Sequence, residues 1–491
     1  MPKEKRVKRI ALNKWMNEIN DKHFIIEGDI VNCQACNKQI NCHKKSQLTQ
    51  HTNTTIHKQN TGLKNNSATN GNDRVTNINQ FYNDMYEAMV AAKIPWRCLS
   101  NLTWRNFLEK YTDRNVPNEI TLVKNNYLQN LYLSCIRNIR KDIDEYNIWI
   151  SINETTDSDG RFIINLVVGK MCEKESSEPH LLACKKLEKT NHVTIAKFVD
   201  SSIRMLWSNG ENNYNERVLF LITNANSYML KAGKKLKIYY PKMLHLTCLL
   251  NGINKSLEEV RFHYFHVSTL ISAIKQVFLQ SPHRIAIYKD KLPNVPLPPQ
   301  PVITRWVTWL EAALFYAKYL NTIREVIMSF HEKDISIRIA KEILEKENLN
   351  KDLINIEILY EHFLFNIQKL ENQKMTLTES MGIIKQIAKD IDNIPGLFGR
   401  RIKGNFINVL QSNPGYYSLS KIEQILNDTS NEGPKDTLVQ YWNKFKYVPI
   451  TSCDVTRLFP AYKLIFSDKR YNYPMETFEK MIIIYCNANY D

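Results

Sequence analysis

Residues 148–168 read IWISINETTDSDGRFIINLVV and decide the fold of the central part of the chain. Two runs of β-branched and aromatic residues, 148–152 and 162–168, flank the sequence Asp157–Gly160. β-branched and aromatic side chains favour strands, and clusters of Asp, Ser and Gly favour turns. The stretch therefore predicts two consecutive strands joined by a turn.

The residues that follow predict the remainder of a mixed sheet. We expect a third strand at 181–187, an amphipathic helix with its apolar stripe at 195–206, a buried strand at 218–222 and then a helix through Met229. Three strands, a helix, a strand and a helix follow one another in a ribonuclease-H-like sheet. The predicted fold class is α/β.

Composition divides the rest of the chain. Residues 59–79 are rich in Asn, Thr, Gly and Ser and contain few apolar residues, which is typical of a linker. Five prolines between 293 and 301 predict an extended connector before an almost wholly helical region. The predicted segments are a basic arm (1–20), a Cys/His unit (21–60), a linker (61–80), a helical region (81–145), the first part of the sheet domain (146–300), a helical insertion (301–440) and a C-terminal core segment (441–491).

Bulk composition excludes several classes of protein. Of 491 residues, 43% are hydrophobic and 24% charged, which is enough apolar matter for a sizeable core. No apolar stretch approaches the roughly 18 residues of a membrane span, and the basic N-terminus is not a secretory signal. Ten dispersed cysteines predict mostly free thiols. Lys and Arg number 66 against 50 Asp and Glu, a net charge of +16 that favours a polyanionic partner such as nucleic acid.

A metal site is predicted in the Cys/His unit. Cys33 and Cys36 are separated by two residues, fourteen residues follow, and His51 and His57 are separated by five. Two cysteines on a hairpin and two histidines on a helix supply the four ligands of a structural Zn²⁺. The spacing predicts a small ββα zinc finger whose folding depends on the metal. It resembles the BED-type finger; Cys42 and His43 are spare candidate ligands.

The finger is also the most basic part of the chain. Residues 1–64 contain twelve Lys and Arg against five Asp and Glu, which favours nucleic acid as the partner. Counting back along the finger helix from His51 places Lys44, Gln47 and Gln50 toward base edges, with Lys45 and Lys58 toward phosphates. The alternative is that this helix binds protein. The basic run 3–9, which includes Arg6 and Arg9, predicts DNA contact and import into the nucleus.

The finger and the segments after it resemble hAT-type transposases. The matching segments are 149–157 (WISINETTD), 221–229 (LITNANSYM), 245–251 (HLTCLLN), 304–306 (TRW) and 451–460 (TSCDVTRLFP). The subgroup of the CGG-triplet-repeat-binding protein is the most similar. The resemblance implies a ribonuclease-H-like core interrupted by an all-α insertion, with Arg305 and Trp306 positioning DNA ends. A packed Trp with a structural Arg is an equally good account of this pair.

The acids that the resemblance requires are missing. Members of the family hold two divalent cations with three carboxylates, and here the corresponding positions are Asn153, Asn224 and Thr456. Glu154 is expected on the opposite face of its strand, and Asp157 and Asp454 offer a different geometry. We therefore expect no catalysis.

The sequence leaves three functional hypotheses. The first is a zinc-dependent, double-stranded-DNA-binding protein of the nucleus, either domesticated for transcriptional or chromatin work or a decayed element copy. The second is an active hAT transposase using a two-metal mechanism, and the third is a protein-interaction scaffold. The resemblance also implies a homodimer or higher oligomer through the C-terminal segment, although apolar stripes at 458–466 and 478–485 equally fit an ordinary core.

Overall fold

The computed structural model divides the chain into two compact units, which are described separately. The first comprises Met1–Met89 and Trp96–Asn118, and the second Val90–Pro95 and Glu119–Asp491. The structure describes residues 12, 14–16, 18–19, 21, 23–27, 30–36, 38–40, 42, 44–54, 57, 71–92, 94–118, 127–156, 160–207, 214–279, 281–302, 306–331, 333–371, 374–427, 439–452 and 474–488.

The first unit begins with a three-stranded antiparallel sheet followed by a helix. The strands are β1 (Phe24–Glu27), β2 (Ile30–Cys33) and β3 (Lys38–Ile40), in the order β1-β2-β3, and the helix is α2 (Lys45–Thr52). Strand β1 is an addition to the predicted ββα arrangement. Its Phe24 ring is buried in the small core of this unit. That core consists of Leu12, Phe24, Val31, Cys33, Cys42 and Leu48.

Three further helices belong mostly to the first unit: α4 (Gly71–Ala91), η1 (Trp96–Ser100) and α5 (Leu102–Thr112). Helix α4 begins at Gly71, inside the segment 61–80 that composition assigns to a linker. Asn101 caps α5, because its Oδ1 accepts a hydrogen bond from the Trp104 N–H at 3.1 Å. Asn at this position satisfies one of the donors that every helix start leaves unpaired.

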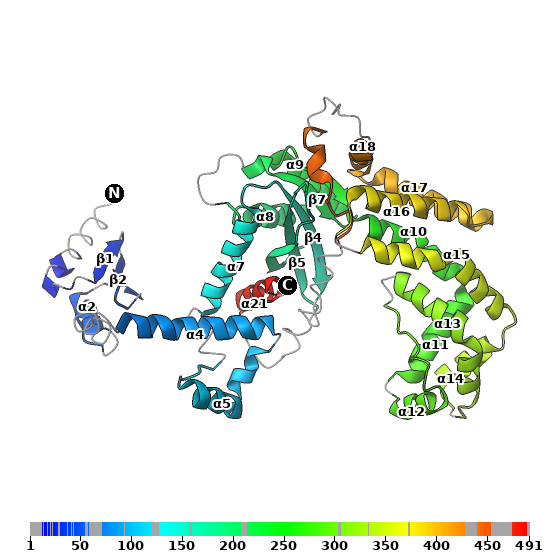
Figure 1. Ribbon diagram of the computed structural model, residues 1–491, viewed down its shortest axis with the longest axis horizontal. Coiled ribbons are helices and arrows are strands. Elements are labelled where there is room, and N and C mark those ends of the chain that lie inside the picture. The colour runs from blue at the N-terminus through cyan, green and yellow to red at the C-terminus, as the bar shows by residue number, and fades with distance from the viewer. Residues whose placement is uncertain are drawn as a thin grey trace. The chain divides into compact units, whose positions relative to one another are not determined.

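The second unit is built on a five-stranded mixed sheet. Its strands are β4 (Ile148–Thr156), β5 (Phe162–Lys170), β6 (His180–Lys186), β7 (Val218–Thr223) and β8 (Leu244–Thr247). The order is β6-β5-β4-β7-β8; β4, β5 and β6 pair antiparallel, whereas β4, β7 and β8 pair parallel (Figure 1). The predictions of the first four strands are confirmed, and β8 is an addition.

Both faces of this sheet are buried. Alternate residues of β4 point to opposite faces, so Ile148 and Ile150 pack with α7 (Tyr127–Ile143), α8 (His192–Ile203) and α9 (Ser227–Tyr239). Trp149 belongs to the core on the other face, together with residues of α10 (Leu249–His263). A Cβ on Gly169 would lie 2.4 Å from the Trp149 ring, so glycine is required opposite this indole.

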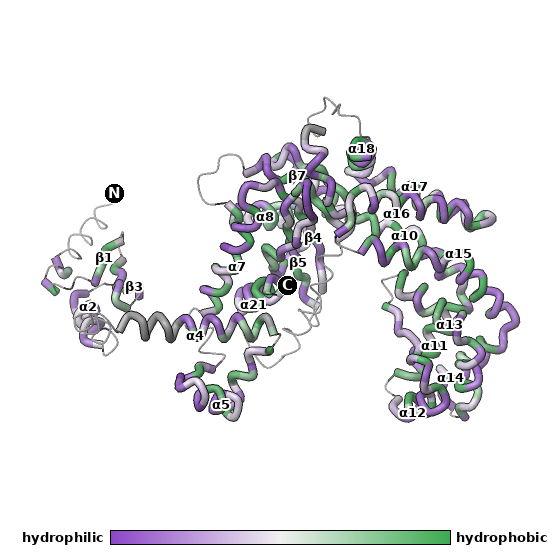
Figure 2. Tube along the Cα trace, in the orientation of Figure 1, coloured by the Kyte–Doolittle hydropathy of each residue, from purple (hydrophilic) through white to green (hydrophobic). Residues whose placement is uncertain are grey.

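Helices beyond the sheet form a single layered region. They are α11 (Phe265–Phe278), α12 (Pro282–Lys291), α13 (Trp306–Met328), α14 (Ile335–Leu344), α15 (Asn348–Leu370), α16 (Leu377–Asp392), α17 (Gly396–Ser412) and α18 (Tyr416–Asn427), followed by the 3-10 turn η3 (Val439–Phe445). Another 3-10 turn, η2 (Tyr214–Glu216), lies in the sheet domain directly before β7. Both hydrophobic and hydrophilic residues colour each of these helices in Figure 2, as expected of amphipathic helices. Helices α11 and α12 pack with α13 and α14, so the helical region starts before residue 301.

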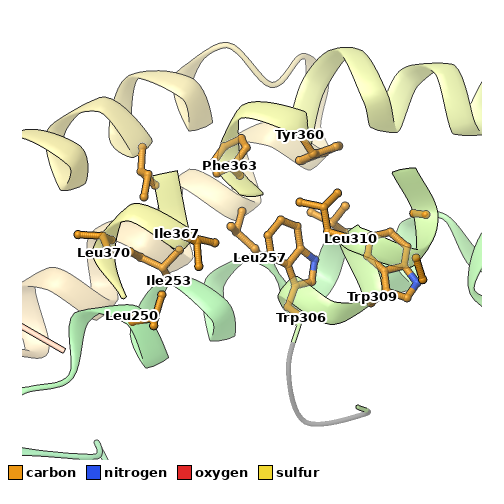
Figure 3. Close-up of a cluster of buried hydrophobic side chains, with 14 of the residues drawn as sticks. Leu250, Ile253, Leu257, Trp306, Trp309, Leu310, Tyr360, Phe363, Ile367 and Leu370 are labelled. Atoms are coloured by element: carbon orange, nitrogen blue, oxygen red, sulfur yellow. The ribbon is translucent and has the colours of Figure 1, made fainter. Parts of the chain in front are cut away.

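An aromatic cluster lies at the centre of this helical region. Trp306 packs edge-on against Tyr360 and Phe363, with ring centroids 6.5 and 6.4 Å away, and Leu257 lies beside it (Figure 3). Large apolar side chains of this kind dominate core stability. The cluster therefore joins α10, α13 and α15 into one core.

The last described helix, α21 (Met475–Asn487), covers the edge of the sheet. The Asn487 amide accepts from the Leu181 N–H at 3.1 Å and donates to the Leu181 carbonyl at 2.9 Å, so it satisfies edge-strand groups of β6. Ile482 and Ile483 are buried in the core. This part of the C-terminal stripe is used within the chain; residues 458–466 lie outside the described residues. Within the described residues, no helix has both the length and the apolar composition of a bilayer span.

Candidate metal centre

The four predicted metal ligands meet in the first unit. Cys33 ends β2, Cys36 lies in the turn before β3, His51 lies in the last turn of α2, and His57 follows that helix. One ligand atom from each residue lies within 4.8 Å of the other three. The four residues that the sequence spacing predicts as ligands therefore lie together, in a cluster that could hold a metal ion.

His57 is oriented for coordination through Nδ1. This atom lies 3.4 Å from the Cys33 Sγ and 3.4 Å from the Cys36 Sγ. On the other side of the ring, Nε2 lies 2.7 Å from the Asp21 Oδ2. A proton on Nε2 would donate to Asp21 and leave the Nδ1 lone pair for a metal, an arrangement common around metal-bound imidazoles. Asp21 is a residue that motif spacing missed, since it lies outside the ligand pattern.

His51 supplies the test of whether a metal fits. Its Nε2 is buried, and no hydrogen-bond partner for it exists among the described residues. A buried nitrogen without a partner is costly unless something else occupies its lone pair. Zn–S bonds of about 2.3 Å and Zn–N bonds of about 2.0 Å separate tetrahedral ligand atoms by roughly 3.3–3.8 Å, in line with the observed 3.4 Å contacts. The donor set and the contacts of His57 with both cysteines fit a tetrahedral ion.

The surroundings of the cluster shift the pKa values of Cys33, His51 and Asp21. Burial raises the pKa of the Cys33 thiol; the backbone N–H of Cys36 opposes this rise by hydrogen bonding, whereas the Cys36 side chain adds to it. Burial, together with nearby His57, lowers the pKa of His51. Burial alone would raise the pKa of Asp21, but hydrogen bonds from His23 and His57 hold it below its ordinary value. A bound cation would favour the thiolate forms that burial disfavours.

The spare ligand candidates do not join the cluster. Cys42 is buried in the finger core, and its thiol donates to the Lys44 carbonyl oxygen at 3.8 Å. It is not part of the four-residue group. His43 lies outside the described residues.

Helix α2 presents the predicted DNA-contacting side chains to solvent. Lys44, Lys45, Gln47 and Gln50 are all exposed. Lys45 Nζ pairs with the Glu18 Oε2 at 2.6 Å, and Gln47 Oε1 accepts from the Lys44 N–H at 3.1 Å. The other predicted contacts in the basic arm and elsewhere, namely Arg6, Arg9, Lys58 and Arg305, lie outside the described residues.

Trp306 has a different environment from the one that DNA contact would require. Its side chain is 0% exposed and lies in the aromatic cluster of the helical region. The sequence left two roles open for Trp306, positioning DNA ends or packing in the core. Its burial agrees with packing in the core. Its neighbour Arg305 is not described.

Two of the three positions that the transposase resemblance assigns to acids lie on neighbouring strands: Asn153 is in β4, and Asn224 directly follows β7. Ser151 pairs with Ile222 in the parallel ladder, and Asn153 and Asn224 each lie two residues further along their chains. Asn153 Oδ1 accepts from the Glu154 N–H at 2.9 Å, and Asn224 Oδ1 accepts from the Asn226 N–H at 3.0 Å. The position corresponding to the third acid, Thr456, lies outside the described residues, as do Asp157 and Asp454.

Glu154 faces away from these amides, as strand alternation predicts. Its Oε2 accepts a hydrogen bond from the Tyr228 hydroxyl at 2.6 Å, on the α9 side of the sheet. Burial raises the pKa of Glu154, and burial with the adjacent carboxylate raises that of Tyr228 to about 12. Glu154 is therefore occupied by Tyr228 rather than directed toward Asn153.

Comparison with known proteins covers the sheet and the helices around it. Residues 120–281 match a family described as a domain of unknown function (DUF659). This domain is associated with hAT-type transposases. No curated protein matches the chain. The matched residues include Asn153 and Asn224 but not the finger.

Proposed function

We propose that this protein is a zinc-dependent DNA-binding protein that derives from a hAT transposase and no longer catalyses transposition. One observation carries the proposal: the Cys33, Cys36, His51 and His57 ligand atoms converge within 4.8 Å, with a buried His51 nitrogen that needs a partner. Two thiolates and two imidazoles form the usual ligand set of structural zinc. The ion would hold the finger together and thereby orient α2.

Double-stranded DNA is the partner that the finger's surface supports best. Lys45 and Gln50 are exposed on α2, Lys44 is exposed at its N-cap, and the N-terminal residues of the sequence are strongly basic. Lys neutralises phosphates and Gln can pair with adenine in the major groove. Binding should therefore weaken steeply as salt rises. The basic run 3–9 supports a nuclear location and, with it, a role in transcription or chromatin.

Transposase ancestry is supported by the family match and by the strand order. The match at residues 120–281 covers the central sheet. The order β6-β5-β4-β7-β8, in which β6, β5 and β4 pair antiparallel and β4, β7 and β8 pair parallel, supports the proposal of a ribonuclease-H-like sheet. A relation to the CGG-triplet-repeat-binding group is supported by the Cys/His unit and by the sequence segments that resemble hAT transposases, namely 149–157, 221–229, 245–251, 304–306 and 451–460. Homodimerisation is part of the same proposal, and light scattering that detects only a monomer would contradict it.

Loss of catalysis is supported by the chemistry of the sheet end. Amide oxygens of Asn153 and Asn224 carry no charge, whereas Mg²⁺ prefers carboxylates. The competing hypothesis of an active transposase predicts metal-dependent nicking of terminal-inverted-repeat DNA. Nicking with Mn²⁺ that disappears in Asp157→Ala or Asp454→Ala would establish that hypothesis instead.

The deciding experiment is a binding-site selection on the intact chain, with and without a zinc chelator. We expect enrichment of a defined duplex sequence that is lost on chelation and in Cys36→Ser. Cys98→Ser is the matched control, because Cys98 lies on η1, outside the metal cluster. Enrichment that survives both chelation and Cys36→Ser would contradict recognition through the finger, and no enrichment would favour a protein-interaction scaffold.

A further inference from the structure

A cavity in the second unit has the chemistry of an anion site. Its volume is about 130 Å³, and it lies between α11, the end of α10 and the start of α13. The lining residues are Arg261, Ser268, Ile271, Ser272, Lys275, Gln276, Pro301, Val302 and Trp309. Ser272, Gln276 and Val302 are exposed, so the lining reaches the surface. Two lining residues are cationic and no described lining residue is acidic.

Trp309 is the unusual member of this lining. Its side chain is only 2% exposed, yet its indole N–H has no acceptor among the described residues. A buried donor without an acceptor costs free energy, and the Trp309 side chain forms part of the cavity wall. Trp309 lies one turn along α13 from Trp306, whose indole lies in the aromatic cluster (Figure 3).

The cationic side chains are held at the cavity by their neighbours. Lys275 Nζ lies 3.4 Å from the Pro301 carbonyl oxygen, a long contact that leaves other ammonium hydrogens to donate. Arg261 Nη1 donates to the Glu258 Oε1 at 3.1 Å, which fixes the guanidinium beside the cavity. Ser268 donates to the Arg261 carbonyl at 2.7 Å, so its hydroxyl oxygen is oriented as well.

We propose that this cavity binds a phosphate group. An ammonium, a guanidinium, the Ser272 hydroxyl and an amide provide donors from several directions, which suits a tetrahedral oxyanion with charge on several oxygens. The phosphate could belong to a polynucleotide backbone or to a small phosphorylated molecule, and the recognition chemistry is the same for both. This inference is independent of the zinc finger, because every lining residue belongs to the second unit.

The test uses indole NMR resonances of the full chain, which has eight tryptophans. Trp309→Phe and Trp306→Phe assign the two relevant signals, and ionic strength is held constant with chloride. Titration with inorganic phosphate should shift the Trp309 N–H signal saturably and leave the Trp306 signal in place. Acetate serves as the comparison anion, and an equal response to acetate would contradict the assignment to phosphate.

Charge variants give the second arm of the test. Lys275→Gln should weaken phosphate binding about tenfold, because it removes a charge-assisted hydrogen bond. Lys255→Gln, an exposed lysine on α10 that does not line the cavity, should leave binding unchanged. Equal affinity in Lys275→Gln and the unaltered protein would overturn the proposal.

A single-stranded oligothymidylate without terminal phosphates distinguishes the two sources. A Trp309 shift with this oligonucleotide identifies backbone phosphate as a ligand, and a shift with inorganic phosphate alone identifies a small phosphorylated molecule. Either result supports the site. Failure of both ligands to move the Trp309 signal would overturn it, whatever the finger binds.

Discussion

The zinc-finger cluster and the end of the central sheet both gather polar side chains, but they differ in charge and in what supports them. The finger offers two thiols and two imidazoles on a core of six buried residues. The sheet end offers the neutral amides of Asn153 and Asn224 on a sheet packed on both faces. A small unit depends on its metal for stability, whereas a large core keeps its fold without one. We therefore expect loss of metal ligands to be tolerated at the sheet and not at the finger.

The largest effect is expected from breaking the finger cluster. Cys36→Ser removes one of four ligands, and structural zinc contributes about 10–16 kcal/mol of apparent binding free energy in such modules. We expect loss of bound metal and rapid proteolysis of the finger, with the sheet remaining protected. Metal content and limited proteolysis measure both effects. Cys98→Ser is the control, and full metal retention in Cys36→Ser would refute the assignment of this ligand.

The sheet should instead be sensitive to acid through His245. Burial lowers the pKa of His245 to about 4, from an ordinary value of 6.5, and Thr223 Oγ1 lies 2.9 Å from its Nε2. Between these pH values the unfolded chain binds the additional proton, so the free energy of unfolding falls as pH drops from 6.5 toward 4. The expected loss is at most about 3 kcal/mol.

Urea unfolding between pH 7.5 and 4.5 tests this expectation. The pH dependence should flatten in His245→Gln and persist in His331→Gln, because His331 is exposed. An unchanged dependence in His245→Gln would show that other groups control acid stability.

A smaller effect is expected from the residue that orients His57. Asp21→Asn weakens the acceptor for the His57 Nε2 proton, whose present contact is 2.7 Å. Removal of such a partner usually lowers metal affinity about 10–100-fold. Competition with a chromophoric chelator measures this loss. Glu18→Gln is the matched control, since Glu18 pairs with Lys45 and not with a ligand; equal losses in both variants would assign the effect to general charge.

The smallest effect is a gain of Mn²⁺ binding at the end of the sheet. Asn153→Asp combined with Asn224→Asp places two carboxylates on neighbouring strands, where we expect weak Mn²⁺ binding in about the millimolar range. Electron paramagnetic resonance of free Mn²⁺ measures it. Asn251→Asp, an exposed position on α10, controls for added charge. Equally strong Mn²⁺ binding by the unaltered protein would show that the amides of Asn153 and Asn224 do not prevent metal binding at the sheet, and the expected difference from the Cys/His cluster would be wrong.

Local pattern predicted much of the fold because the residues concerned are close in sequence. The runs at 148–152 and 162–168 are long and apolar, and they form β4 and β5. Strand β8 has only four residues, Leu244–Thr247, and is fixed by pairing with β7. A four-residue run carries little periodicity, so its pairing partner rather than its sequence identifies it.

Spacing along the chain was sufficient to name Cys33, Cys36, His51 and His57, because ligands of one small module lie close together in sequence and their chemistry is particular to metals. It was also sufficient to find amides at two positions that the transposase resemblance assigns to acids. Tertiary packing alone decided the Asp21 contact with His57, 36 residues away, the burial of Trp306 and the cavity beside Trp309. These features depend on side chains from separate elements meeting in a packed interior, and no local pattern encodes such meetings.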